Sequence, residues 1–152
     1  MKYLKYFESE ESNNIKLINF INDKSITDII KLLDSEKINI DYQEEKLKWT
    51  PLMCSYNNVE ILKLLLEYGA NPNIQETDGW TVLMICVIFD CQDCAKELLK
   101  NGANLYIKNR FGNTFFDIIK PYTKIKDEIF KEFPEIYKEY LTYMKAKKYN
   151  IL

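Results

Sequence analysis

Cys91 and Cys94, with two residues between them, are the pair in this sequence whose type and spacing could do chemistry. A Cys-x-x-Cys pair can exchange disulfides, or it can supply two of the four ligands of a zinc site. Disulfide exchange needs a strand–helix–strand setting, and the surrounding sequence does not have that pattern. For zinc, Cys86 could be a third ligand, but the chain has no histidine and Cys54 lies far away along the chain. We therefore expect a small buried position for Cys86, with a redox or metal site at Cys91 and Cys94 as the lesser alternative.

Other catalytic patterns are missing. Without histidine there is no Ser-His-Asp triad and no His-ligated metal site. The acidic pairs Glu44-Glu45 and Glu76 with Asp78 fall in polar stretches where carboxylates stay solvated and ionised. No Walker loop, Gly-x-Gly-x-x-Gly motif or serine elbow occurs. We expect a protein that is not an enzyme and that binds no cofactor and no metal.

The composition is that of one ordinary domain. The 152 residues are 47% hydrophobic and 29% charged, with 21 basic and 23 acidic side chains, so there is no basic excess for a nucleic-acid backbone. The longest apolar run, from Val82 to Phe89, is too short to span a membrane, and no signal-peptide core follows Met1. We expect a monomeric cytoplasmic protein with reduced thiols. Abundant Ile, Asn and Tyr, with Arg110 as the one arginine, are typical of an AT-rich genome such as that of a virus or a protist, and a viral chain would work in the host cytoplasm.

An internal repeat organises the chain. Gly69, Gly79 and Thr81 recur at one constant offset, as Gly102, Gly112 and Thr114, which gives a repeat length of about 33 residues. Thr50-Pro51-Leu52 predicts a helix start, with Thr50 as N-cap and proline in the first helical position. The apolar spacing from Ile61 to Leu66 predicts a second helix, after which a glycine can take a left-handed conformation.

A helix, a short turn, a second helix and a projecting hairpin in a unit of this length resemble the ankyrin repeat. The resemblance is carried by Thr50-Pro51-Leu52-Met53, by Gly79-Trp80-Thr81-Val82-Leu83-Met84, and by Gly69-Ala70-Asn71-Pro72-Asn73 with its copy Gly102-Ala103-Asn104. It implies an all-α fold: an ankyrin-repeat α-solenoid of stacked helix-turn-helix units with short fingers that are β-hairpins or loops. We expect a degenerate N-terminal capping repeat at 1–47, repeats at 48–78 and 79–111, a C-terminal capping repeat at 112–133, and an extra helix at 134–152.

The chain departs from that family pattern in three ways. Met53 and Met84 stand where the family has histidine, which predicts packing in place of a hydrogen bond. Thr50 lies two positions closer to Thr81 than Thr81 lies to Thr114, so we expect either the first helix or the turn after it to be clipped, with residues 55–58 forming that turn. Lys48 replaces a turn glycine, which predicts a looser first finger.

The extra helix has two interpretations. Ile136, Tyr140 and either Tyr143 or Met144 lie at helical spacing, so the helix would seal the C-terminal edge of the stack. Alternatively, the segment from Phe133 to Ile136 is similar to the start of the F-box-like segment of some viral ankyrin proteins. That similarity would make the chain an adaptor that recruits a ubiquitin ligase.

The resemblance also implies a function, namely binding another protein on a concave surface. In the family this surface consists of the finger tips, here 42–48, 75–78 and 108–111, and the exposed side of each first helix. The candidate contacts are Trp49, Trp80, Asn113, Glu76, Asp78, Arg110, Phe111 and Phe89. The two tryptophans are the strongest, because large amphipathic aromatics concentrate binding energy. Packing between repeats is the alternative for both.

Overall fold

The computed structural model describes residues 13–35, 38–119 and 124–149, and in these ranges it contains helices and loops but no strands. Residues 13–22 are helical and pair with α2 (Ile26–Ser35). Three further helix pairs follow, and a longer helix ends the described chain: α3 (Pro51–Cys54) with α4 (Val59–Glu67), α5 (Val82–Ile88) with α6 (Gln92–Lys100), α7 (Phe115–Ile118) with α8 (Lys124–Glu132), and α9 (Pro134–Lys148).

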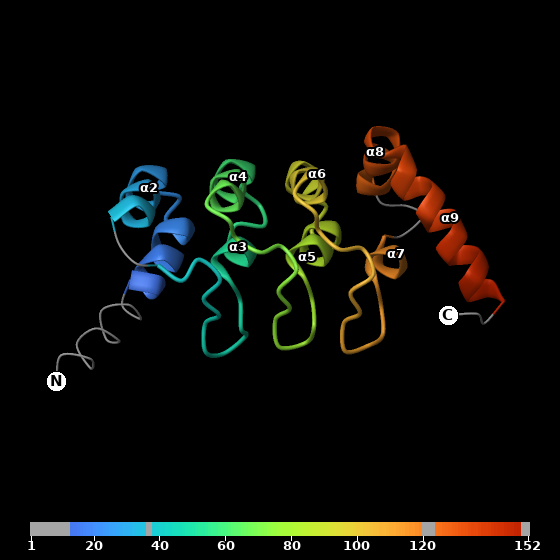
Figure 1. Ribbon diagram of the computed structural model, residues 1–152, viewed down its shortest axis with the longest axis horizontal. Coiled ribbons are helices and arrows are strands. Elements are labelled where there is room, and N and C mark those ends of the chain that lie inside the picture. The colour runs from blue at the N-terminus through green and yellow to red at the C-terminus, as the bar shows by residue number, and fades with distance from the viewer. Residues whose placement is uncertain (1–12, 36–37, 120–123, 150–152) are drawn as a thin grey trace.

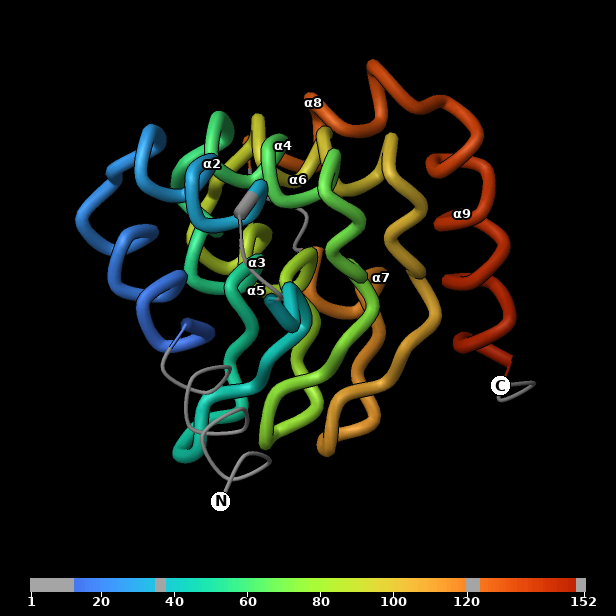
Figure 2. Tube along the Cα trace, turned by 60° about the vertical axis from the view of Figure 1, so that its left-hand side comes forward, coloured from blue at the N-terminus to red at the C-terminus, as the bar shows by residue number. Residues whose placement is uncertain are grey.

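The helix pairs stack side by side to form a solenoid (Figure 1). The second helices α2, α4, α6 and α8 form one row, and α3, α5 and α7 form a second row beneath it. Three loops, called the fingers here, project from the second row at residues 42–48, 75–78 and 108–111 and lie next to one another in two views (Figures 1 and 2). The expected all-α solenoid is confirmed.

Threonines start the first helices, as the repeat pattern predicts. The Thr50 hydroxyl accepts a hydrogen bond from the Met53 N–H at 3.2 Å, and Thr81 accepts one from Met84 at 3.4 Å. Met53 and Met84 are buried in the core, which confirms that they pack where the family has histidine. Thr114 begins α7 with a capping box that it shares with Asp117.

The shortening of the second repeat lies in its first helix. Helix α3 has 4 residues and α5 has 7, and Ser55 ends α3. The turn expected at residues 55–58 follows α3, whereas the turn between α5 and α6 is one residue shorter and has Asp90 in a left-handed conformation, with φ of 55°. Of the two possibilities, a clipped helix and a clipped turn, the structure therefore shows the first.

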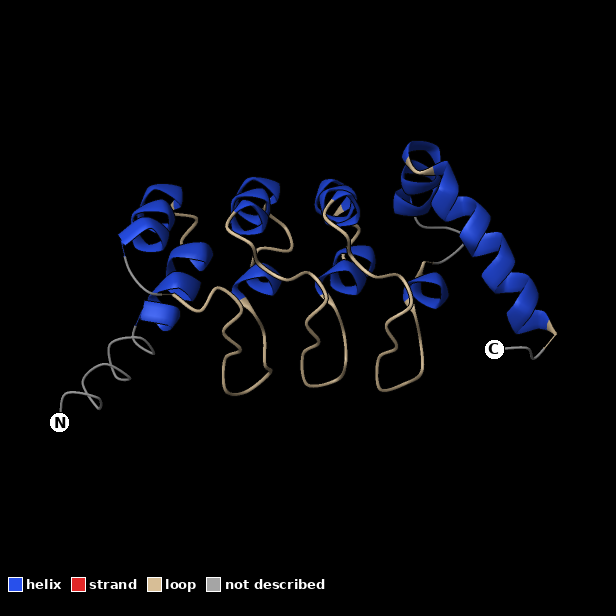
Figure 3. Cartoon of the chain, viewed as in Figure 1, coloured by secondary structure: helices blue, strands red, loops and turns tan. Residues whose placement is uncertain are grey.

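Of the two expected forms, the fingers take that of loops, and no strand lies in them (Figure 3). Each is closed by too few main-chain bonds for a ladder: in the second finger the Glu76 N–H donates to the Trp80 carbonyl at 3.1 Å, and Gly79 donates to Glu76 at 2.9 Å. In the first finger Lys48 takes the glycine's left-handed conformation, with φ of 60°. Its N–H bonds the carbonyl of Glu44, four residues back instead of three. The first finger is therefore one residue longer than the second, and the looser finger expected from Lys48 stays a prediction.

The C-terminal helix packs against the last repeat. Ile136 is buried, and the Tyr143 ring lies 5.2 Å from that of Phe116, while Met144 is 42% exposed. Tyr143, not Met144, therefore completes the inward face. This packing agrees with the interpretation of α9 as a cap, and it leaves the ubiquitin-ligase alternative as an untested prediction. Proline cannot continue a helix, so the sequence predicts that Pro121 stops α7, but this residue lies outside the described residues.

Candidate functional site

Each finger is held in shape by one polar side chain of its own. The Glu76 carboxylate accepts from the N–H groups of Asp78 at 2.8 Å and Trp80 at 2.9 Å. In the third finger the Asn109 side-chain oxygen accepts from Phe111 and Asn113, both at 3.0 Å. Glu76 was expected to contact a partner, but its carboxylate oxygen is occupied within its own finger.

Glu44 does the same in the first finger. Slight burial alone would raise the pKa of this carboxyl, but backbone N–H groups from Lys46 to Trp49 outweigh it and lower the pKa. The carboxylate therefore stays ionised and keeps the finger closed. Sequence reasoning treated this acid as a solvated loop charge, and the signal it missed is that Glu44 and Glu76 each directly follow a glutamine, Gln43 and Gln75.

Two glutamines tie the fingers together. The Gln43 side chain donates to the carbonyls of Lys48 at 2.8 Å and of Gln75 at 3.0 Å. One repeat later, Gln75 donates to Gly79 at 2.7 Å and to Lys108 at 2.9 Å. Each glutamine thus bonds its own finger and the next, so that the three fingers form one connected surface.

An ion pair adds to these links at the finger tips. The guanidinium nitrogen Nη1 of Arg110 lies 2.6 Å from the Asp78 carboxylate, and the Arg110 N–H donates to the Asp78 carbonyl at 2.9 Å. The guanidinium also lies 4.8 Å from the centroid of the Phe111 ring, which is 60% exposed. Three of the candidate residues therefore form one cluster, in which Phe111 and the Arg110 side chain are the most exposed. Asn113 is half-buried at the base of the same finger.

A row of aromatic rings runs from the base of the first finger to the end of α5. The ring centroids of Trp49 and Tyr56 are 6.2 Å apart in a T-shaped arrangement, and those of Tyr56 and Phe89 are 5.0 Å apart. Phe89 is 58% exposed and the neighbouring Ile88 is 52% exposed. Tyr56 was missed by sequence reasoning, because its position depends on how the turn at residues 55–58 folds.

Trp80 occupies the position of Trp49 in the next repeat. Both tryptophans are half-buried and pack against the hydrophobic core. Each therefore supports its repeat with one part of the ring and leaves another part accessible. The two interpretations of the tryptophans, partner contact and packing, are both compatible with this burial.

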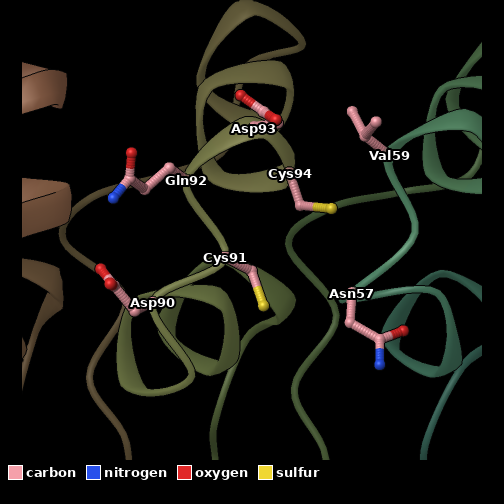
Figure 4. A pocket seen from close by; sticks show the side chains of 7 residues that line it. All are labelled: Asn57, Val59, Asp90, Cys91, Gln92, Asp93 and Cys94. Carbon is pink, nitrogen blue, oxygen red and sulfur yellow. The ribbon is translucent and has the colours of Figure 1, made fainter.

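Cys91 and Cys94 line a hollow of about 340 Å³ beside the second repeat. Asn57 and Val59 lie on one side of it, and the sulfur atoms of Cys91, in the turn, and of Cys94, in the first turn of α6, are directed toward the second repeat (Figure 4). A hydrogen bond with Cys94 and burial raise the pKa of the Cys86 thiol, and the same bond lowers that of Cys94. Cys86 is fully buried, as expected. In the described ranges no group of three or more Cys, Asp or Glu side chains is placed to hold a metal ion.

No helix among the residues that the structure describes is long and apolar enough to cross a membrane.

Known proteins similar to this chain share the repeat architecture. A family model for ankyrin repeats in three copies matches residues 17–109. An ankyrin repeat protein of Acanthamoeba polyphaga mimivirus is 28% identical over 117 residues, which are 72% of this chain and 15% of that protein. One of Rickettsia felis is 33% identical over 105 residues, covering 62% of this chain and 46% of that protein. The chain thus spans less than half of either relative.

One relative has a name that describes a role. Protein phosphatase 1 regulatory subunit 27 of Mus musculus is 27% identical over 120 residues, which are 78% of each chain. Among solved structures, the ankyrin repeat domain of Bcl-3 superposes with a TM-score of 0.69 at 23% identity, covering 74% of this chain and 50% of that one. At that identity the superposition shows a shared fold.

Proposed function

The chain belongs to the ankyrin-repeat family, and we propose that it is a non-enzymatic module that binds a partner protein on the surface formed by its fingers and first helices. Ankyrin repeats are in general protein–protein interaction modules. The relative named as a phosphatase regulatory subunit supports this role, because that name describes a chain that works together with another protein.

The aromatic row Trp49–Tyr56–Phe89 is the observation that carries the proposal. A stack of repeats needs its buried apolar residues, but it does not need a phenylalanine that is 58% exposed. Aromatic rings bury a large area at a small entropic cost, and they are enriched among the residues that dominate binding energy. Because the rings already contact one another, a partner would meet an ordered surface.

The fingers extend this surface and are rigid before binding. Gln43 and Gln75 connect them, and Glu76 closes the middle one, so little conformational freedom is left to lose. Phe111, supported by the Arg110 guanidinium, presents a second exposed ring at the third finger. We therefore expect contacts at two places, the aromatic row and the tip of the third finger.

Affinity capture with the intact chain tests the proposal. The bait is compared with Phe89→Ser and Phe111→Ser variants, and with Tyr149→Ser as a matched control, since Tyr149 is 67% exposed at the far end of α9. We expect a partner captured by the wild type to be lost from both phenylalanine variants and kept by the tyrosine variant. Partners held equally by all four chains would contradict the proposal.

A further inference from the structure

A second hollow lies away from the fingers, between α8 and α9. It has a volume of about 510 Å³ and is lined by Phe130, Tyr137, Tyr140, Leu141 and Lys131, together with Lys126 and Asp127. The rings of Tyr137 and Tyr140 lie 5.2 Å and 5.1 Å from the Phe130 ring. The two helices pack together at the end of the stack (Figure 2), so this C-terminal groove is a preformed part of the fold.

Helix α9 has two apolar faces, and the stack uses one of them. Tyr140 and Tyr143 contact Phe116 of the last repeat. Tyr137, Leu141 and Met144 lie at positions i, i+4 and i+7 on the other side and are 44%, 41% and 42% exposed. Single exposed apolar residues are ordinary, but three in one helical stripe beside a hollow are typical of a contact surface.

Charge is segregated between the two sides of the groove helices. The acidic side chains that face the stack are neutralised there: Glu132 pairs with Lys96 at 3.2 Å and with Lys100 at 2.9 Å, and Glu128 pairs with Lys96 at 3.2 Å. On α9, Glu139 accepts a hydrogen bond from the Tyr106 hydroxyl at 2.7 Å. The charges of Glu128 and Glu132 are therefore offset by lysines, and Glu139 is directed toward Tyr106 and is not part of the groove lining.

Among the remaining exposed charges of α8 and α9, lysines outnumber the acidic side chains, which include Glu135 in the first turn of α9. Lys131 lines the groove, and Lys138 and Lys145 are exposed along α9. The one acid in the lining, Asp127, has Lys126 as a neighbour at 3.9 Å. The groove is thus apolar and aromatic at its centre and basic around it.

We propose that the C-terminal groove binds an acidic segment of a second protein, anchored by a large apolar side chain. The anchor would lie on Phe130, Tyr137 and Leu141. The carboxylates that flank it would approach Lys131 on α8, and Lys138 and Lys145 on α9. Apolar contact supplies the affinity, and the lysines select an acidic partner and speed its association. This site is separate from the finger surface, so the chain would join two proteins.

Three labelled peptides of one length test the proposal by fluorescence anisotropy with the full chain. The first carries Glu and Leu at helical spacing, the second replaces every Glu by Lys, and the third replaces every Leu by Gln. We expect the first to bind at least about tenfold more tightly than the others, with weakening as salt is raised. Equal binding of all three peptides would overturn the proposal.

Variants locate the binding site. Leu141→Glu and Lys131→Glu should each weaken the binding of the acidic peptide by about tenfold or more. Leu47→Glu, which places the same charge on a 56% exposed leucine of the first finger, should leave it unchanged. If Leu141→Glu lowers the helical circular dichroism, Tyr137→Ser serves as a second variant that removes an apolar contact from the groove. Undiminished binding by Leu141→Glu and Tyr137→Ser would refute the site.

Two measurements separate this proposal from competing ones. Phe89→Ser should still bind the acidic peptide. The result for the groove would therefore stand even if the finger surface bound no partner. Sedimentation of the wild type should give a monomer. A dimer that Leu141→Glu dissociates would show that a second copy covers the groove, and would overturn the proposal of an acidic partner.

Discussion

Gln75 has the same relation to the third finger as Gln43 has to the second: each donates its side-chain amide to one carbonyl of its own finger and to one of the next. Lys108 takes the equivalent position in the third finger, where the described chain has no fourth finger to join. The glutamines therefore link repeats at a distance from the helical core.

Gln75→Ala should destabilise the fold although the residue is exposed. Two hydrogen bonds to backbone carbonyls are lost, and we expect the free energy of unfolding to fall by about 1–2 kcal/mol. Urea unfolding followed by circular dichroism measures this change. Gln92→Ala, at the start of α6, is the control and should change little. If both variants were as stable as the wild type, the glutamine links would have no energetic role.

Alanine substitutions at Gly79 and Gly112 separate the cost of backbone strain from the cost of steric contact. Both are left-handed, with φ of 80° and 76°, but a Cβ on Gly79 would lie 2.9 Å from the Asn109 Cα, while one on Gly112 meets nothing within 4 Å. Gly112→Ala should therefore cost about 1 kcal/mol for its φ alone, and Gly79→Ala about 2–3 kcal/mol because the third finger must move. Thermal unfolding of the two variants checks the order, and equal costs would contradict the close approach of the fingers.

The helical part of this structure could be predicted from the sequence, and the surface part less well. Thr50, Pro51 and the left-handed glycines act within a few residues of chain, so local rules place them. The hydrogen bonds that the Glu76 carboxylate accepts depend on how its finger folds in three dimensions. The position of Tyr56 depends in the same way on the turn at residues 55–58. Interactions between repeats have no local sequence signal apart from the repeat period. The relation between Gln43 and Gln75 was therefore not predicted.

Asp117 should make stability depend on pH in the acid range. Burial alone would raise the pKa of this carboxyl, but Lys147, the Tyr143 hydroxyl and Thr114 outweigh it and hold the pKa at about 2, below its usual 3.8. Because the folded pKa is the lower one, the stabilisation is present at neutral pH and is lost as pH falls from about 5 toward 2. We expect a loss on the order of 1–2 kcal/mol, discounted for solvent at Lys147.

The Asp117→Asn variant isolates this contribution. Its free energy of unfolding should be lower than that of the wild type at pH 7, and the difference should shrink steadily toward pH 2.5. Denaturant unfolding at a series of pH values measures both curves. A difference that stays constant over this range would mean that the carboxyl titrates normally and that its contacts with α9 are weak.

Trp80 should contribute to both stability and binding. The ring is half-buried against the core, so Trp80→Ala is expected to lower the free energy of unfolding by about 1–3 kcal/mol. Trp80→Phe keeps an apolar ring in the same place and should recover most of that loss. The two variants therefore divide the roles: if Trp80→Phe folds stably but still loses the captured partner, the indole contacts the partner directly. If it restores binding together with stability, Trp80 acts by packing its repeat, and Phe89 with Phe111 would provide the contacts.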